Sequence, residues 1–158
     1  MSKLKSKIIA LVVFILLAIF FIPQKYIVET KVLPRVSVNN MQCNPQVKEC
    51  KVDIDDIRLN ISLDKNIYYL KPFNIVVGSN DKNGSKIKDI HIEFKMKNMD
   101  MGVNRFKLTL YNNKHWKSKL LLPICITGRA DWIAALEVVT ESSEYVISFP
   151  VSVEKVVS

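Results

Sequence analysis

Glycine, histidine and cysteine are scarce in this chain, and their scarcity excludes several classes of function. The 158 residues include four glycines, three cysteines and two histidines. So few glycines leave no glycine-rich phosphate loop, and no Gly-x-Ser-x-Gly motif occurs. The acidic run DIDD at 53–56 lacks the pattern of a calcium loop. We therefore do not expect an enzyme.

Positive charge is abundant, but its distribution is not typical of a nucleic-acid-binding protein. The formal net charge is +8, and nineteen of the 23 basic residues are lysines scattered along the chain. Surfaces that bind phosphate backbones favour arginine and continuous basic stripes. We therefore expect no nucleic-acid partner. An excess of lysine is compatible with a domain that lies close to an anionic membrane.

The chain has one long apolar run, at its N-terminus. Three lysines in MSKLKSK precede fifteen apolar residues, 8–22, which as a helix would rise about 22 Å. A cleaved signal peptide is the alternative, but it would end in small residues, whereas this run ends FFIPQK. We predict an uncleaved transmembrane signal anchor at 8–23. Residues 1–7 would form a cytoplasmic tail, with the rest outside the cytoplasmic (inner) membrane, in the periplasm.

The cysteines agree with an oxidising compartment. Residues 24–50 form a predicted linker in which Cys43 and Cys50 lie seven apart, with Pro45 between them, so we predict a small disulfide loop. Cys125 is left over, and three interpretations of it stay open. It is a buried thiol, a partner for one of the other two cysteines, or a ligand. A redox-active thiol that exchanges with the Cys43–Cys50 bridge is a weaker idea, because it requires an accessible thiolate.

Apolar and polar residues alternate along most of the chain after residue 50, which predicts β-strands. The alternating segments are 57–63, 73–79, 90–96, 105–111, 120–126, 132–138 and 145–153. About seven strands separated by turn sequences predict an all-β, immunoglobulin-like antiparallel sandwich over residues 51–158. Pro150 falls inside the last segment and predicts an edge position there.

Three of the five methionines lie in the short stretch MKNMDMG. Met96 has the inward parity of its strand and should lie in the core, whereas Met99 and Met101 fall in a connecting loop. The thioether is soft and uncharged, which suits Cu(I). We predict a Cu(I) site formed by Met99 and Met101 and completed by Met96, His115 or Cys125. For His115 this requires its loop to lie at the same end of the sandwich as the methionine loop.

A resemblance supports this chemistry. Residues 73–138 contain a methionine-rich turn, then Phe106 and Leu108 in a strand, then Trp116, and then Gly128 and Trp132 at the next strand. This pattern resembles the FixH/YtkA-like group of small exported β-sandwich domains, and the single N-terminal anchor resembles its FixH members. The resemblance implies an immunoglobulin-like fold. It also implies a role in copper handling or in the assembly of a haem–copper respiratory oxidase.

A second function stays open, in which the domain binds no metal. It would dock on an integral-membrane complex through a strip that contains the methionine loop, Arg105, Trp116 and Trp132. Tryptophan and arginine are the residues that interface hot spots favour, and exposed methionines form adaptable contact surfaces. Specific binding of Cu(I) would separate the first function from the second.

Overall fold

The computed structural model describes residues 7, 11–15, 17, 32–38, 43–81, 86–125 and 127–154. The chain divides into two compact units, Met1–Val32 and Leu33–Ser158. In the first unit, residues 7, 11–15 and 17 are helical. Among the residues described, no helix has the length and apolar composition needed to cross a bilayer. The predicted tail and anchor, 1–7 and 8–23, lie mostly outside the described residues.

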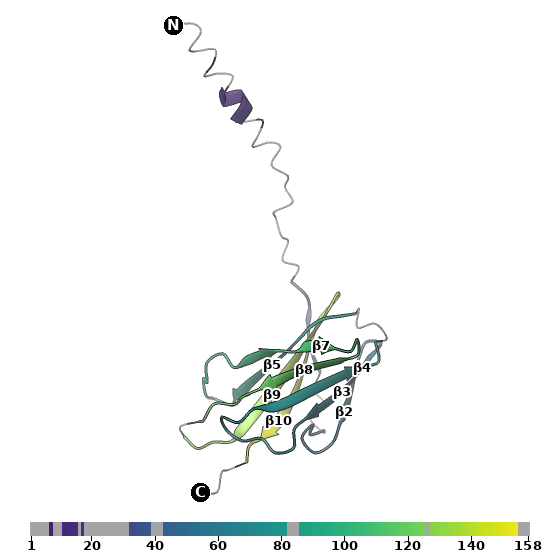
Figure 1. Ribbon diagram of the computed structural model, residues 1–158, viewed down its shortest axis with the longest axis vertical. Coiled ribbons are helices and arrows are strands. Elements are labelled where there is room, and N and C mark those ends of the chain that lie inside the picture. Colours follow the sequence, from purple (N-terminus) through teal and green to yellow (C-terminus); the bar gives the residue numbers. More distant parts are fainter. Residues whose placement is uncertain are drawn as a thin grey trace. The chain divides into compact units, whose positions relative to one another are not determined.

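The second unit is a β-sandwich of two sheets, and its described residues form five strands in each (Figure 1). The first sheet has the order β1 (Arg35–Val38), β10 (Glu144–Ser152), β9 (Asp131–Thr140), β5 (Ile87–Met96) and β6 (Arg105–Lys107). The second has the order β2 (Cys50–Ile54), β3 (Ile57–Leu63), β4 (Phe73–Ser79), β8 (His115–Leu120) and β7 (Thr109–Tyr111). Every pairing is antiparallel except β1 with β10. The all-β sandwich is confirmed.

The core is made by the inward residues of alternating strands. In β5, the buried positions Ile90, Ile92 and Phe94 alternate with half-buried polar residues on the outer face. The Phe94 ring meets Phe73 of the opposite sheet edge to face, with centroids 6.0 Å apart. Apolar surface removed from water contributes about 25 cal/mol per Å2, so the interdigitated faces hold the two sheets together.

Two predicted strands differ from the structure. The segment 105–111 is two strands, because the chain changes sheets at Leu108, whose side chain is fully buried. Residues 105–107 pair with β5, and residues 109–111 pair with β8. The strand predicted at 120–126 is wrong. Of residues 120–125, which the structure describes, only Leu120 belongs to a strand. Pro123 removes a backbone donor, and a turn follows at Cys125.

Part of the predicted linker belongs to the sandwich. Residues 35–38 form β1, which pairs in parallel with residues 144–147 of β10. Four residues are too few to show a reliable alternation, and their partner lies more than 100 positions away in the sequence. Pro150 lies beyond the part of β10 that pairs with β1. An N–H at position 150 would point toward the β1 side of β10, as the N–H of Glu144 does. At Pro150 no strand of the described residues lies on that side, so the predicted local edge position agrees with the structure.

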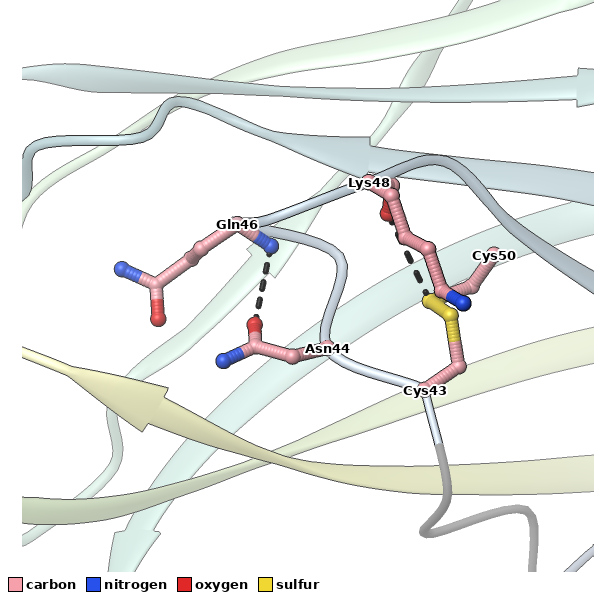
Figure 2. The surroundings of a disulfide bond; sticks show 5 residues. All are labelled: Cys43, Asn44, Gln46, Lys48 and Cys50. Carbon is pink, nitrogen blue, oxygen red and sulfur yellow. Dashed lines mark hydrogen bonds between the residues drawn. A yellow bond between two sulfur atoms is a disulfide. The ribbon is translucent and has the colours of Figure 1, made fainter.

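The Cys43–Cys50 disulfide is confirmed, and it closes a loop that docks on both sheets (Figure 2). The Asn44 side chain accepts a hydrogen bond from the Gln46 backbone N–H at 2.9 Å, and the Pro45 carbonyl accepts one from Leu63 at 3.0 Å. The Cys50 sulfur lies 3.7 Å from the Lys48 carbonyl oxygen. This is a packing contact, since a disulfide sulfur carries no hydrogen.

The Gln46 side chain makes the two hydrogen bonds that a neighbouring strand would make at the end of β10. Its amide nitrogen donates to the Ser152 carbonyl at 2.8 Å, and its amide oxygen accepts from the Ser152 N–H at 2.7 Å. Gln46 is 7% exposed, so its own amide is nearly buried, and the two hydrogen bonds to Ser152 satisfy it. The disulfide loop is thereby joined to the first sheet.

Candidate functional site

The three methionines meet where β5 ends. Met96 is the last residue of β5, points into the core and is 4% exposed, as predicted. A tight turn follows in which the Met99 N–H donates to the Met96 carbonyl at 3.3 Å. Asn98 occupies the left-handed position of this turn with φ of 58°, which asparagine tolerates better than most residues. The turn brings Met99 directly beside Met96.

A second turn places Met101. The Asp100 carboxylate accepts a hydrogen bond from the Gly102 N–H at 2.8 Å, and Gly102 has φ of 68°. The chain then returns to β5, where the Phe94 N–H donates to the Asn104 carbonyl at 2.9 Å. Met99 and Met101 are half-buried and pack against the core. Their side chains are therefore less exposed than we expected for residues of a connecting loop.

The connection between β8 and β9 brings Cys125 to the same place. Leu122 and Cys125 are buried, and the Gly128 N–H closes a turn by donating to the Cys125 carbonyl at 3.0 Å. Gly128 has φ of 71°. In this turn the Cys125 sulfur lies 3.5 Å from the Met99 sulfur. The structure thus joins two residues that are 26 positions apart in the sequence.

Cys125 is a free thiol that is 3% exposed, in agreement with the buried-thiol interpretation. Its sulfur lies 3.0 Å from the Thr127 hydroxyl, so a set of bonds in which Thr127 donates to sulfur and the thiol donates to Met99 satisfies all three groups. The hydrogen bond with Thr127 lowers the pKa of Cys125 more than any other interaction does. Backbone N–H groups and the charge of Arg129 act in the same direction, and burial opposes them.

Two adjoining hollows reach the methionines of this cluster, whereas the Cys125 side chain lies behind them and is buried. One, of about 370 Å3, is lined by all three methionines together with Val103 and neighbouring backbone. The other, of about 410 Å3, lies between the methionine loop and the turn that carries Cys125, and is lined by Met99, Met101, Ile124 and Thr127. A small ion can therefore approach the cluster from the sides of the loop.

The donor set fits a soft metal ion. Thiolate and thioether sulfur are the ligands that select Cu(I), whereas zinc, calcium and magnesium need imidazole, several thiolates or oxygen. Among the described residues, no group of three or more histidine, cysteine, aspartate or glutamate side chains could hold a metal ion. Met99 and Cys125 would hold the ion, with Met96 and Met101 beside them.

His115 does not belong to this cluster. Leu120 of β8 pairs with Phe73, whose ring packs on Phe94 near the methionine end. His115 is five residues away, about 16 Å along the strand, and its Nδ1 lies 2.9 Å from the Asn112 side chain. The expectation that His115 shares an end with the methionine loop is wrong. The chain between the two loops, 105–111, runs from one end of the sandwich to the other, first as β6 and then as β7.

Two residues of the predicted interaction strip are buried. Trp132 is 1% exposed and Trp116 is 6% exposed, because each has the inward parity of its strand. Neither indole can contact a partner at the surface, so their assignment to an interaction surface is wrong. Arg105 is at the surface but donates to the carboxylate of Glu137 at 2.6 Å. Arg35 takes the other oxygen of that nearly buried carboxylate, at 2.8 Å.

Sequence reasoning missed Thr127, which holds the thiol. The signal available for it was the order Cys-x-Thr-Gly, in which glycine closes a turn that brings the hydroxyl back to sulfur. It also missed Tyr69, whose hydroxyl donates to the Arg129 carbonyl at 2.6 Å and fixes the far side of that turn. Nothing near Tyr69 in the sequence indicates this contact.

In comparisons with protein-family models and with curated proteins, nothing matches this chain. The likeness to the FixH/YtkA-like group therefore depends on the residues quoted for it.

Proposed function

We propose that this protein is a membrane-anchored, extracytoplasmic β-sandwich that binds one Cu(I) through Met99 and Cys125. In this proposal Met96 and Met101 complete the coordination, and the protein assists copper delivery or the assembly of a haem–copper respiratory oxidase. The N-terminal anchor and the role in assembly come from the apolar run at 8–22 and from the resemblance to FixH-like domains.

The observation that carries the proposal is the 3.5 Å separation of the Met99 and Cys125 sulfurs. A methionine alone is most simply a core residue, and a buried cysteine is most simply inert. Here a thiol with a lowered pKa and a thioether face each other from different loops beside an open hollow. A thiolate is the form of cysteine that binds metal, so the environment of Cys125 favours ligation.

The proposed site suits transfer rather than permanent storage. Thioether ligands are neutral, and those of Met99 and Met101 are supplied by a loop that is half-exposed. An incoming ligand from a partner can therefore replace one sulfur at a time without a charge being buried alone. The bound Cu(I) would be a closed-shell ion carried as cargo, and the sulfur atoms of this chain would hold and release it.

Strand order supports the immunoglobulin-like type. Without β1 and β2, the sheets read β3-β4-β8-β7 and β10-β9-β5-β6. These orders correspond to A-B-E-D and G-F-C-C′ in the immunoglobulin fold. We infer on this basis that β1 and β2 are additions to an immunoglobulin-like frame.

The test is a Cu(I) titration of the full chain in detergent, with ascorbate present and a chromophoric chelator as competitor. We expect about one Cu(I) per chain, and we expect the double variant Met99→Leu, Met101→Leu to lose at least tenfold in affinity. Leucine conserves the volume of methionine, so the fold should tolerate both changes.

The matched control is Val103→Leu, which changes an exposed position of the same loop and removes no sulfur. Its affinity should equal that of the parent chain. Unchanged binding in the double methionine variant, with thermal unfolding also unchanged, would exclude these side chains as ligands.

A further inference from the structure

Four exposed aliphatic side chains gather at the end of the sandwich that carries the sulfur cluster. They are Val103 at 92% exposed, Leu70 at 57%, Ile124 at 55% and Leu121 at 40%. They come from three separate connections, between β3 and β4, between β5 and β6, and between β8 and β9. We call these four residues the apolar end.

Contacts join the three connections into one surface. The Leu70 N–H donates to the Leu122 carbonyl at 3.0 Å, which places Leu70 beside Leu121. Ile124 and Met101 line the same hollow, and Met101 and Val103 line the next one. Met101 therefore links Ile124 to Val103, and Leu121 lies three residues before Ile124 in the same connection.

The opposite end of the sandwich has a different composition. Its connections place Asp55 and Asp56 between β2 and β3, Asn112 and Asn113 between β7 and β8, and Glu141 and Ser142 between β9 and β10. An isolated exposed aliphatic residue needs no explanation, but several at one end opposite a polar end indicate a contact surface.

Leu70 adds evidence from the backbone. Its φ is 55°, in the left-handed region that asparagine and glycine adopt easily and that leucine adopts at a cost. The side chain gains no burial in return, because it is more than half exposed. The fold thus holds an aliphatic side chain toward solvent against its local preference, which is expected where another molecule covers it.

Charge and aromatic content indicate what kind of molecule covers it. Lys97 lies in the methionine loop together with Asp100, whose carboxylate accepts the Gly102 N–H. Lys71 follows Leu70, with its ammonium group 4.9 Å from the centre of the Tyr68 ring. Neither lysine has a carboxylate partner within the described part of the chain. Aliphatic side chains backed by tyrosine and unpaired lysines match the layers of a lipid surface, in which acyl chains lie beneath anionic headgroups.

We propose that the apolar end inserts into the headgroup region of a bilayer that contains anionic lipid. Leu70, Val103 and Ile124 would enter the apolar layer, and Lys71 and Lys97 would contact phosphate groups. The chain enters the sandwich at the other end, at Arg35. Residues 24–34 can extend to about 37 Å, and the nine residues of β10 measure about 30 Å, so the length of the chain permits either end to approach a bilayer.

The test uses the full chain, without copper, in liposomes of phosphatidylcholine with or without phosphatidylglycerol. An environment-sensitive fluorophore is attached to Val103→Cys, to Ile124→Cys, or to Lys114→Cys at the polar end. Cys125 is buried, and the unsubstituted chain measures its background labelling. Val103 is almost fully exposed, so its replacement should leave the fold intact.

With phosphatidylglycerol present, we expect blue-shifted emission at 103 and 124 that nitroxide-labelled lipids quench several-fold, and water-like emission at 114. Lys97→Glu should reduce the quenching at 103. Water-like emission at all three positions would overturn the proposal. That result is also expected if a protein partner, absent from the liposomes, covers this end. The proposed lipid contact depends on the proposed function only for the membrane anchor. A failed copper titration would therefore leave this result unaffected, and the reverse also holds.

Discussion

Left-handed backbone conformations at single residues build the loops around the sulfur cluster. Asn98, Gly102 and Gly128 have φ values of 58°, 68° and 71°, and each is a residue that adopts this conformation readily. They turn the chain so that Met99, Met101 and Cys125 face one another. Leu70 is the exception at this end of the sandwich, since its side chain disfavours the conformation that it adopts.

Replacing Leu70 should therefore stabilise the protein. We expect Leu70→Asn to raise the free energy of unfolding by about 1 kcal/mol, because asparagine relieves the left-handed strain and keeps the backbone N–H that bonds to Leu122. Thermal or urea unfolding measures the change. Leu121→Asn, at a neighbouring exposed position, should give no gain. A loss of stability in Leu70→Asn would show that the leucine side chain contributes packing.

Ionisation of the Cys125 thiol should make the copper affinity depend on pH. Because its pKa lies below the ordinary value, more thiolate is present near neutral pH than in an unperturbed cysteine. Cu(I) displaces the thiol proton, so the apparent affinity should be constant above the folded pKa and fall about tenfold per pH unit below it. Titrations at a series of pH values test this. Cys125→Ser should bind more weakly with no such slope, whereas a flat profile in the parent would indicate methionine ligands alone.

Several residues were predictable from local patterns. The position of Met96 follows from strand parity and the Cys43–Cys50 pair from spacing, whereas the burial of Cys125 was one of three interpretations that the sequence left open. The proximity of Cys125 to Met99 was not predictable, because it depends on two turns and on the pairing of β5 with β9. The same inward parity that marks Met96 also marks Trp116 and Trp132. Their interpretation as surface residues gave residue type more weight than position.

At the scale of elements, most strands with an apolar inner face were predicted closely. β2 was missed although its inner positions Cys50, Val52 and Ile54 are buried, because it is five residues long and overlaps the predicted linker. The segments 57–63 and 73–79 coincide with β3 and β4. β8 was missed because its sequence, HWKSKL, has only two buried residues. β1 was missed because its partner in β10 is distant in the sequence. Hydrophobic alternation reports burial on one face and carries no information about such pairing.

The disulfide loop gives a prediction at this scale. Gln46→Ala should lower the free energy of unfolding by about 1–2 kcal/mol, because it removes both hydrogen bonds between the disulfide loop and the Ser152 backbone. Val47→Ala, in the same loop but 77% exposed, should change stability by less than about 0.5 kcal/mol. Urea unfolding with the disulfide intact compares the two. Equal effects would mean that the loop acts only through its disulfide.

At the scale of the whole molecule, the sandwich has two chemically distinct ends. The sulfur cluster and the exposed aliphatic side chains lie at one end, together with Asp100 of the methionine loop, and the connections at the other end carry acidic and amide side chains. A single sequence does not show which connections share an end unless every strand between them is counted correctly. The missed sheet change at Leu108 and the missed strand at 115–120 show how easily that count fails.

His115 tests this division. Because it lies about 16 Å along β8 from the methionine end, His115→Ala should leave the Cu(I) affinity unchanged within twofold. The competition titration used for the methionine variants measures it. A large loss of affinity would mean that copper binds away from the Met99–Cys125 pair. The Asn112 contact predicts only a local loss of order in the turn before β8.

The parallel pairing of β1 with β10 has a mechanical consequence. Any tension in the chain before residue 33 reaches the sandwich through β1, whose four residues run alongside 144–147. A pull along the strand axis stretches the hydrogen bonds of this pair together rather than breaking them one after another. The salt bridge from Arg35 to Glu137 adds an attachment to the next strand. For a pull in that direction the sandwich meets the load in shear, with the hydrogen bonds of the pair sharing the force.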